Sequence, residues 1–479
     1  MILINYLVVF TIAVFTMVAL VYVHRTRYRY TTIDAFLTAR GTLGVWASAA
    51  TVFASIMGGW ILFTPAEAGT WGGVTAFTGY AVAQALAIAI YAILGSRMRL
   101  VAPRGSSLVE FVYYRYGRLM YAVILVVGVF YMAVFLCAEL TGIALGVNMV
   151  TGLPLWFTAL LIGAGTMLYT TYGGIRGSIF TDAIQAVIII PALLLAFVGA
   201  VVASGGVGAL FSAVGEIDPS LLSMGHWGGW EFALSLLIAV VAANLFHQGF
   251  WSRVYACRDS FTVKSSFLLA GIMIVPVVIL AGSFGLIAVS KGLLDVPSAA
   301  LFEVVLSITP LWVLLVVLVL ALALVMSSTD TLLNGIAAVF TVDLARFYPS
   351  LPQERLRIWA RIFTAAVCVI VVAVASRGYS VLYLFFLADL VCAAAVFPTF
   401  YGLYSSRLGG KEAVVAVLIG IAAGAFFFPD PAFSRGNLLH AFVVALVVPA
   451  VISFILSILS STAAVDLEDL QEKVQDIKT

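Results

Sequence analysis

A short polar stretch from Leu324 to Asn334 interrupts a long apolar run of the sequence. Ser327, Ser328 and Thr331 repeat at helical spacing, so together with Leu324 and Asn334 they share one face of a helix. Two hydroxyls and a backbone carbonyl on this face supply oxygen, the ligand type that small hard cations prefer. The same pattern also suits close helix packing, with each hydroxyl bonded to the preceding turn, and taken alone that use is the commoner one.

A second source of oxygen atoms is the segment 54–65, which reads ASIMGGWILFTP. The adjacent Gly58 and Gly59, followed by Pro65, weaken a helix at this point. Irregular backbone in a membrane is tolerated only where it lines a cavity or is buried in protein. Carbonyl groups freed at such a break can coordinate a cation, although a glycine pair can also form a packing notch between helices.

Several ionisable side chains fall inside apolar stretches, where they are costly and are functional candidates by default. They are Glu67, Glu139, Asp182, Asp330, Asp389 and His247. Asp182 also suits a helix cap, Glu67 the outer interface, and His247 a hydrogen-bonded core position. For Glu139 and Asp389 we favour a role as hydrogen-bond partners between helices. Asp330 lies about 12 residues, or about 18 Å, from the end of its helix, which is near the middle of a bilayer.

The composition indicates that lipid surrounds these residues. Of 479 residues, 63% are hydrophobic and 10% are charged, and the mean hydropathy is +1.16. A soluble domain carries about 25% charged residues, so we expect one all-α membrane domain over residues 1–465. A net charge of +2 gives no basic surface for nucleic acid. The longest connection, 204–228, is too short for an enzymatic domain, so no enzyme activity is expected.

A helix needs about 20 apolar residues to cross the hydrocarbon layer, and we count thirteen such spans. They are 3–23, 44–69, 72–95, 119–148, 154–172, 175–203, 229–253, 265–290, 308–342, 358–376, 379–403, 412–428 and 439–460. With the N-terminus outside, 21 of the 24 Lys and Arg residues fall on the inner side. Because positive charge marks the cytoplasmic side, we expect a cell-membrane protein with an outer N-terminus and a cytoplasmic tail at 466–479.

Several segments together resemble the sodium/solute symporter family, which includes sodium/glucose and sodium/proline transporters. The most specific is 169–185, YTTYGGIRGSIFTDAIQ, which resembles the family signature of Tyr, a Gly-Gly pair, and Thr-Asp followed by Gln three positions on. Other similar segments follow in the family's order across most of 40–400; they are 54–60 (ASIMGGW), 107–117 (SLVEFVYYRYG), 248–253 (QGFWSR), 326–334 (MSSTDTLLN) and 340–344 (FTVDL).

The resemblance implies the leucine-transporter fold, with two inverted five-helix repeats behind an extra N-terminal helix. On our span count the repeats cover about 44–203 and 229–403. Each repeat should begin with a helix that is broken near the middle of the membrane, around Ile56–Gly59 and around Asn244–Gly249. The solute is then expected between the two breaks, where half-helix ends present dipoles and unsatisfied backbone groups.

The resemblance also implies a sodium site where the two oxygen-bearing segments meet. Carbonyl oxygens would come from Ala54, Met57 and Leu324, and hydroxyls from Ser327 and Ser328. Sodium is the only metal and the coupling ion that we expect, without any other cofactor.

A second cation lies deeper in some members of the family, bound by the aspartate that matches Asp182 and by later hydroxyls. Those later positions here are Asp330 and Thr331, so two carboxylates would share either a sodium ion or a proton. From fold geometry we expect the solute near six further residues. They are Ser55, Gly58, Glu67, His247, Gln248 and Trp251.

These observations predict sodium-driven symport of a small organic solute by alternating access. The solute classes considered are an amino acid, a urea-like compound, a carboxylate or a sugar, with small neutral or zwitterionic solutes favoured over bulky sugars. The expected partners are this solute, sodium and the bilayer, for a monomer or a weak homo-oligomer. Proton-coupled symport, motivated by Asp330, is the nearest alternative. An uncoupled channel and a solute sensor are others.

Overall fold

The computed structural model describes residues 2–26, 39–347, 352–431 and 434–459 and the single residues 470 and 474. Side chains at 171–186, at 342–347 and at a few single positions lie outside this description, as does most of the predicted tail 466–479. The helices, with η marking 3₁₀ helices, are α1 (Ile2–Thr26), α3 (Val45–Ile56), η2 (Gly59–Leu62), α4 (Thr64–Ala89), α5 (Tyr91–Val101), α6 (Leu108–Tyr116), α7 (Arg118–Thr151), α8 (Leu155–Ala203), α9 (Val207–Ile217), η3 (Pro219–Leu222), α10 (Trp227–Asn244), α11 (Gln248–Ala256), α12 (Ser260–Lys291), η4 (Pro297–Ala299), α13 (Ala300–Ile308), α14 (Leu311–Phe347), α15 (Gln353–Ala375), α16 (Val381–Tyr401), α17 (Gly410–Phe427) and α18 (Leu438–Leu459).

The described helices are those of a multi-pass membrane protein. Ten of them are long and apolar enough to cross a bilayer, or up to eleven if the bent pair Val187–Ala203 and Val207–Ile217 forms one span. The thirteen predicted spans stay a prediction, because some of them lie on helices too short to cross alone. Thus α3 has 12 residues.

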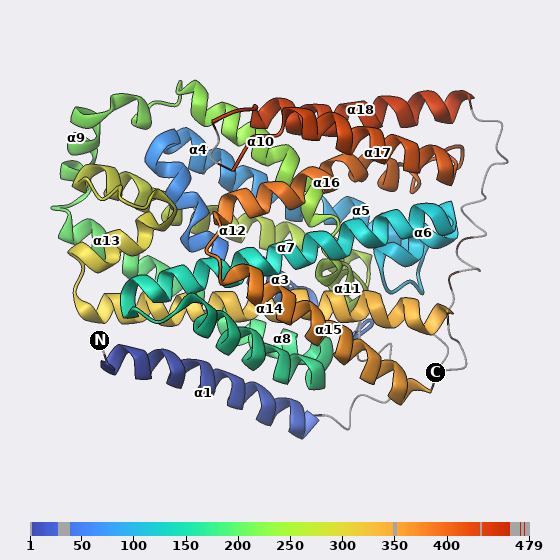
Figure 1. Cartoon of the computed structure of the whole chain (residues 1–479), viewed down its shortest axis with the longest axis horizontal. Helices are drawn as coiled ribbons and strands as arrows, with labels where there is room; N and C mark the ends of the chain where they lie inside the picture. The colour runs from blue at the N-terminus through green and yellow to red at the C-terminus, as the bar shows by residue number, and fades with distance from the viewer. Residues whose placement is uncertain are drawn as a thin grey trace.

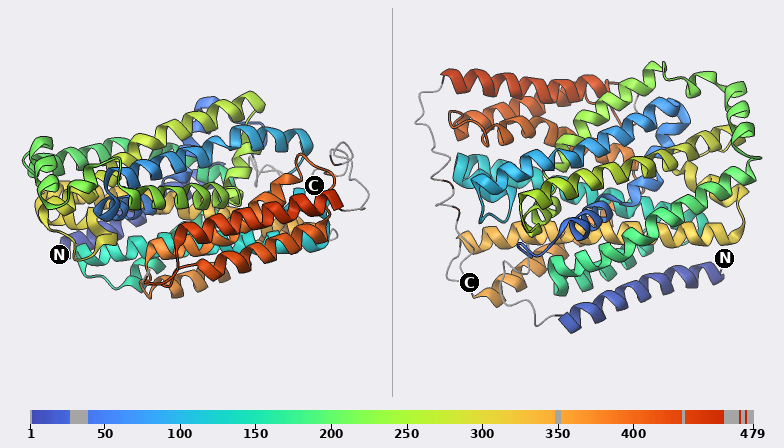
Figure 2. Two further views of the ribbon diagram at one scale, coloured as in Figure 1. Left: turned by 90° about the horizontal axis from the view of Figure 1, so that it is seen from above. Right: turned by 180° about the vertical axis from the view of Figure 1, so that it is seen from behind.

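The long helices run roughly parallel, with α17 and α18 at one edge of the bundle and α1 at the opposite edge (Figures 1 and 2). The beginning of α1 lies at the same end of the bundle as α9 and α13, whereas α6 lies at the other end (Figure 1). The predicted topology requires this arrangement, since it assigns 204–228 to the same side as the N-terminus and 99–118 to the opposite side. Which end faces the cytoplasm remains a prediction.

The two predicted helix breaks are confirmed. The first separates α3, which ends at Ile56, from η2, which begins at Gly59. The second separates α10, which ends at Asn244, from α11, which begins at Gln248. At the second break the freed carbonyl of Asn244 accepts a hydrogen bond from the Tyr91 hydroxyl at 2.6 Å, and Leu245 accepts one from the Trp251 indole at 2.7 Å. Buried side chains therefore satisfy the backbone groups that the missing helical turn leaves open.

The two broken helices are also tied together at their α3 and α11 ends. The backbone N–H of Leu43 donates to Ala256 at 3.0 Å, and that of Arg258 donates back to Leu43 at 2.9 Å. The guanidinium of Arg99, at the end of α5, donates to the carbonyls of Val254 and Cys257 at 2.9 and 2.6 Å. The backbone bonds join the start of the first broken helix to the end of the second, and Arg99 ties α5 to the same end.

A glycine forms the turn at which the first broken span ends and the next span begins inside α4. Gly73 has φ 59° and ψ −151°, a conformation that L-residues with a side chain rarely adopt. The turn agrees with the predicted limits of the two spans, 44–69 and 72–95. Helix α4 packs along both α10 and α12.

Candidate functional site

The oxygens predicted to hold a cation meet at the first helix break. The Ser327 hydroxyl of α14 lies 3.2 Å from the carbonyl oxygen of Ala54 in α3. The Ser328 hydroxyl lies 3.3 Å from the carbonyl oxygen of Leu324, one turn earlier in α14. Met57 is the first residue after α3, and all five residues are buried. The structure thus brings the hydroxyl-bearing face of α14 against the weakened segment of the first broken helix.

Glu139 of α7 joins this group, a position that sequence reasoning did not assign to the cation site. Its carboxylate accepts the backbone N–H of Gly59 at 2.6 Å and of Trp60 at 3.4 Å, together with the Ser328 hydroxyl at 2.7 Å. A side chain at position 58 would collide with this carboxylate, so the close packing here requires glycine. The interpretation of Glu139 as a hydrogen-bond partner between helices is therefore confirmed. It also adds a charge-bearing group beside the predicted sodium oxygens.

A second buried polar group lies around Asp330, further along α14. Its carboxylate accepts the Tyr169 hydroxyl at 3.2 Å and lies 3.4 Å from the Thr331 hydroxyl. The guanidinium of Arg253 donates to the Thr331 hydroxyl at 3.1 Å, so one hydroxyl group separates a fixed positive charge from Asp330. Arg253 is almost fully buried. Asp182, the third expected member of this site, lies outside the described side chains.

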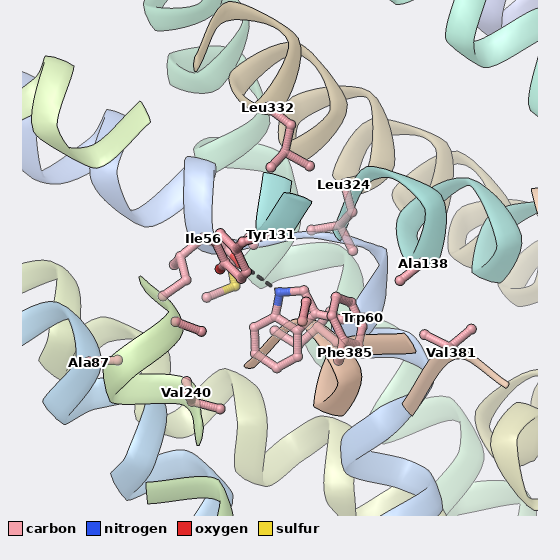
Figure 3. Close-up of a cluster of buried hydrophobic side chains, with 14 of the residues drawn as sticks. Ile56, Trp60, Ala87, Tyr131, Ala138, Val240, Leu324, Leu332, Val381 and Phe385 are labelled. Carbon is pink, nitrogen blue, oxygen red and sulfur yellow. Dashed lines mark hydrogen bonds between the residues drawn. The ribbon is translucent and has the colours of Figure 1, made fainter. Parts of the chain in front are cut away.

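A narrow cavity lies between the two helix breaks. Its walls come from α3, η2, α4, α7, α10 and α16, and its volume is about 30 Å³. The residues that line it are Ile56, Trp60, Tyr80, Gln84, Tyr131, Phe135, Leu236, Val240, Ala243, Asn244, Leu382, Phe385, Phe386 and Asp389. Figure 3 shows Ile56, Trp60, Tyr131, Val240 and Phe385 converging from separate helices. This is the position in which the fold predicts the solute.

Trp60 connects the cavity to the predicted cation site. Its indole N–H donates to the carbonyl of Ile56, the last residue of α3, at 2.8 Å (Figure 3). Its ring stacks on Tyr80 with centroids 5.4 Å apart, and it forms part of the cavity wall. Its backbone N–H faces Glu139, which in turn holds Ser328. A rearrangement at Ser328 therefore reaches the cavity wall through two hydrogen-bonded neighbours.

None of the six residues expected near the solute lines this cavity. The Gln248 side chain bonds the backbone of Ser106 at 2.8 Å, and the Trp251 indole closes the second break. The Ser55 hydroxyl bonds the carbonyl of Thr51 at 2.5 Å in its own helix. His247 accepts the backbone N–H of Gly249 at 3.1 Å, so it caps α11.

The remaining two expected solute residues lie close to the cavity without entering it. Gly58 is in the first break, next to Glu139. Glu67 is in the first turn of α4, and its Oε2 atom is buried without a hydrogen-bond partner among the described residues. His247 has edge-on contact with Tyr131 and Phe135, both of which line the cavity, with ring centroids 6.1 Å apart in each pair. His247 therefore packs against two residues of the cavity wall without lining the cavity itself.

For Asp389, the interpretation as a hydrogen-bond partner between helices is wrong. Within the described part of the chain no group donates a hydrogen bond to its carboxylate, which faces the cavity from α16 and is 5% exposed. The sequence did mark it as an ionisable residue in an apolar stretch. Its place in the cavity wall depends on contacts between distant helices, which a single sequence does not reveal.

The chain is similar to known transporters over most of its length. The model of the sodium:solute symporter family matches residues 36–420. A spermidine transporter of Candida albicans is 27% identical over 408 residues, which cover 84% of this chain and 76% of that protein. A sodium/glucose cotransporter of Vibrio parahaemolyticus is 23% identical over 396 residues, which cover 73% of this chain and 72% of that protein.

Solved structures show the same fold. A Na⁺-coupled sialic acid symporter, in a substrate-bound outward-open state, aligns with a TM-score of 0.77 over 96% of this chain and 98% of that one, at 18% identity. Mhp1, a nucleobase-cation-symport-1 family transporter, aligns with a TM-score of 0.62 over 91% of this chain and 98% of that one, at 13% identity. The predicted leucine-transporter fold is thereby confirmed.

Proposed function

The chain belongs to the sodium:solute symporter family, whose members couple sodium entry to uptake of small solutes, and we propose that its sodium ion binds between α3 and α14 while its solute binds in the adjacent cavity. The proposed sodium ligands are the carbonyls of Ala54, Met57 and Leu324 and the hydroxyls of Ser327 and Ser328. The observation that carries the proposal is the 3.2 Å approach of Ser327 to Ala54 at the helix break.

Glu139 makes this cation site electrostatically favourable. Five neutral oxygens compensate a positive charge only partly, whereas a carboxylate hydrogen-bonded to Ser328 adds a full negative charge nearby. The Ser328 hydroxyl donates its proton to Glu139 and keeps its lone pairs for a cation, so the contact orients the ligand. We propose Glu139 as the residue that positions Ser328.

Coupling follows from the position of Trp60 between the two sites. A sodium ion on Ala54 and Ser327 would fix the geometry of the break and so the orientation of η2, which carries Trp60. The cavity wall would then be ordered for the solute. Each ligand stabilises the conformation that the other prefers, which is the thermodynamic requirement for coupled transport. Loss of sodium would release the wall and allow the solute to leave on the other side.

The second predicted cation site, formed by Asp182, Asp330 and Thr331, receives less support. Arg253 supplies a fixed positive charge beside Thr331, which balances Asp330 without an added ion. We therefore propose one sodium ion, at the first helix break, as the principal coupling ion. We also keep the proposal of a cell-membrane location with the N-terminus outside.

Thermal unfolding of the purified protein tests the sodium site. The full chain is heated in sodium chloride and in potassium chloride at equal ionic strength, for the wild type, Ser328→Ala and the control Ser266→Ala. Ser266 is buried in α12 and its hydroxyl bonds the preceding turn at 2.6 Å. Sodium at 100 times its dissociation constant should stabilise the wild type and the control by about 2.7 kcal/mol. An equal response to sodium in Ser328→Ala would refute the assigned ligands.

A further inference from the structure

Asp389 gives the proposed solute cavity a single charged side chain. The other thirteen lining residues are apolar, aromatic or neutral polar, and no lysine, arginine or histidine is among them. Within the described residues the carboxylate has no hydrogen-bond donor and no basic partner. A carboxylate buried in a membrane protein without a partner is costly and is a functional residue by default. Its counter-charge is therefore expected to come from a bound molecule.

The rest of the wall is rich in aromatic rings. Trp60, Tyr80, Tyr131, Phe135, Phe385 and Phe386 line the cavity from four elements. Trp60 stacks on Tyr80, and Phe135 meets Phe385 edge-on with centroids 4.8 Å apart. The faces of aromatic rings attract cations, and the attraction grows when the cation is desolvated. Aromatic cages of this composition are suited to alkylated ammonium groups, whose methylene or methyl groups also contact the rings.

We infer that the solute carried by this protein is a small organic cation, a protonated amine or a quaternary ammonium compound, whose charged nitrogen pairs with Asp389 inside the aromatic cage. The inference rests on the proposed function, since it names the solute class of the same cavity. It departs from the neutral or zwitterionic solutes that the sequence favoured. A zwitterion or an anion would bring a carboxylate next to Asp389, and no lining residue supplies the positive charge to receive it.

The two cations then have separate carboxylates. Glu139 faces the sodium oxygens through Ser328 and does not line the cavity, whereas Asp389 lines the solute cavity from α16. Sodium and an ammonium group therefore need not compete for one negative charge, and both can be bound at once. This separation is what a symporter of a cationic solute requires.

The experiment measures binding of matched probes to the purified full chain in saturating sodium chloride. The probes are n-butylammonium, tetramethylammonium and spermidine as cations, 1-butanol as a neutral match and butyrate as an anionic match. Binding is followed by the shift in unfolding temperature and by isothermal calorimetry. The variants are Asp389→Asn, which removes the charge at nearly constant shape, and the control Glu303→Gln on α13, which makes the same change at a carboxylate outside the lining.

We expect at least one cationic probe to bind at least tenfold more tightly than both butanol and butyrate. Asp389→Asn should weaken that binding about 30-fold or more, as when one partner of a buried charge pair is removed. Glu303→Gln should change it by less than about threefold. Tighter binding of butanol or butyrate, no binding of any cation, or an unchanged affinity in Asp389→Asn would each overturn the inference.

The sodium response separates this inference from the proposed function. If Asp389→Asn loses cation binding but keeps the sodium-specific stabilisation of the wild type, both hold. If it loses the sodium response as well, Asp389 serves sodium rather than the solute and the inference fails. If the wild type shows no sodium-specific stabilisation at all, the proposed sodium site fails, while preferential binding of the cationic probes would still report on the cavity.

Discussion

Replacing Glu139 with glutamine tests the electrostatic part of the cation site. The variant keeps the length and one acceptor oxygen of the side chain but removes its negative charge. The carboxylate lies 2.7 Å from the Ser328 hydroxyl, so a cation bound to that hydroxyl is within about 5 Å of the charge. At an effective dielectric constant near 20, two unit charges at that separation attract by about 3 kcal/mol. Sodium affinity should therefore fall about 100-fold.

The hydrogen bonds at the break add a structural effect. Glutamine can accept both the N–H of Gly59 and the Ser328 hydroxyl with its one oxygen, because both donate to Oε2 of the carboxylate, but its amide group then faces the backbone N–H of Trp60, which is also a donor. Because one charge-assisted contact is lost, the free energy of unfolding without sodium should fall by about 1.5–3 kcal/mol. Glu139→Asp, which retains the charge, should keep more of the sodium affinity than Glu139→Gln.

Sodium titrations followed by thermal unfolding measure both quantities on purified protein. The matched control is Glu303→Gln on α13, whose carboxylate bonds the backbone N–H of Val296 at 2.9 Å, away from the break. Its sodium affinity should equal that of the wild type. A sodium dissociation constant for Glu139→Gln within threefold of the wild type would show that the carboxylate does not contribute to the cation site, and the reasoning would be refuted.

Three further changes test other parts of the account. Trp60→Phe removes the hydrogen bond from the indole to Ile56. Solute affinity should fall several-fold, because about 1 kcal/mol of binding free energy is lost, while sodium affinity without solute should stay near that of the wild type. A solute affinity equal to that of the wild type, measured by calorimetry, would contradict the role of Trp60 in the cavity wall. Arg253→Lys removes the guanidinium group that bonds Thr51, Gly249 and Thr331. Chemical denaturation should show that the free energy of unfolding falls by about 1–3 kcal/mol, whereas the exposed control Arg407→Lys should change it little. Equal losses in both variants would exclude a structural role specific to Arg253. Gly69→Val places a Cβ within 3.2 Å of Gly285 and against the carbonyl of Gly282. The melting temperature should drop, with a loss of about 1–3 kcal/mol in the free energy of unfolding. The control Gly208→Val, whose side chain meets open space, should have a smaller effect, and the reverse order would refute the close packing of α4 on α12.

Much of the fold could be predicted because lipid imposes strong rules on the sequence. Long apolar runs mark helices, and the glycines at 58 and 59 together with Pro65 marked the first break where α3 ends. The second break, after Asn244, has no comparable signal in its own residues. It was predicted only through the resemblance and the inverted repeat that it implies. The number of spans does not follow from apolar runs alone, because broken and short helices do not carry a full run of 20 apolar residues.

The predicted sodium oxygens follow from local rules, and the solute cavity does not. Ser327 and Ser328 share a helix face by their spacing, and a broken helix has free carbonyls, so both halves of the cation site are visible in the sequence. The cavity takes its residues from elements as distant as η2 and α16. Gln248 and Trp251 have polar groups near the second break, but the backbone nearby already uses them. Only the packed structure separates such residues from Asp389.

Equilibrium binding of radioactive sodium to the purified full chain tests the central claim most directly. The claim predicts a saturable site in the wild type and in Ser266→Ala, with affinity at least tenfold weaker in Ser328→Ala, since one hydroxyl ligand and its bond to Glu139 are lost together. Sodium binding in Ser328→Ala equal to that of the wild type would contradict the claim that the ion binds between α3 and α14.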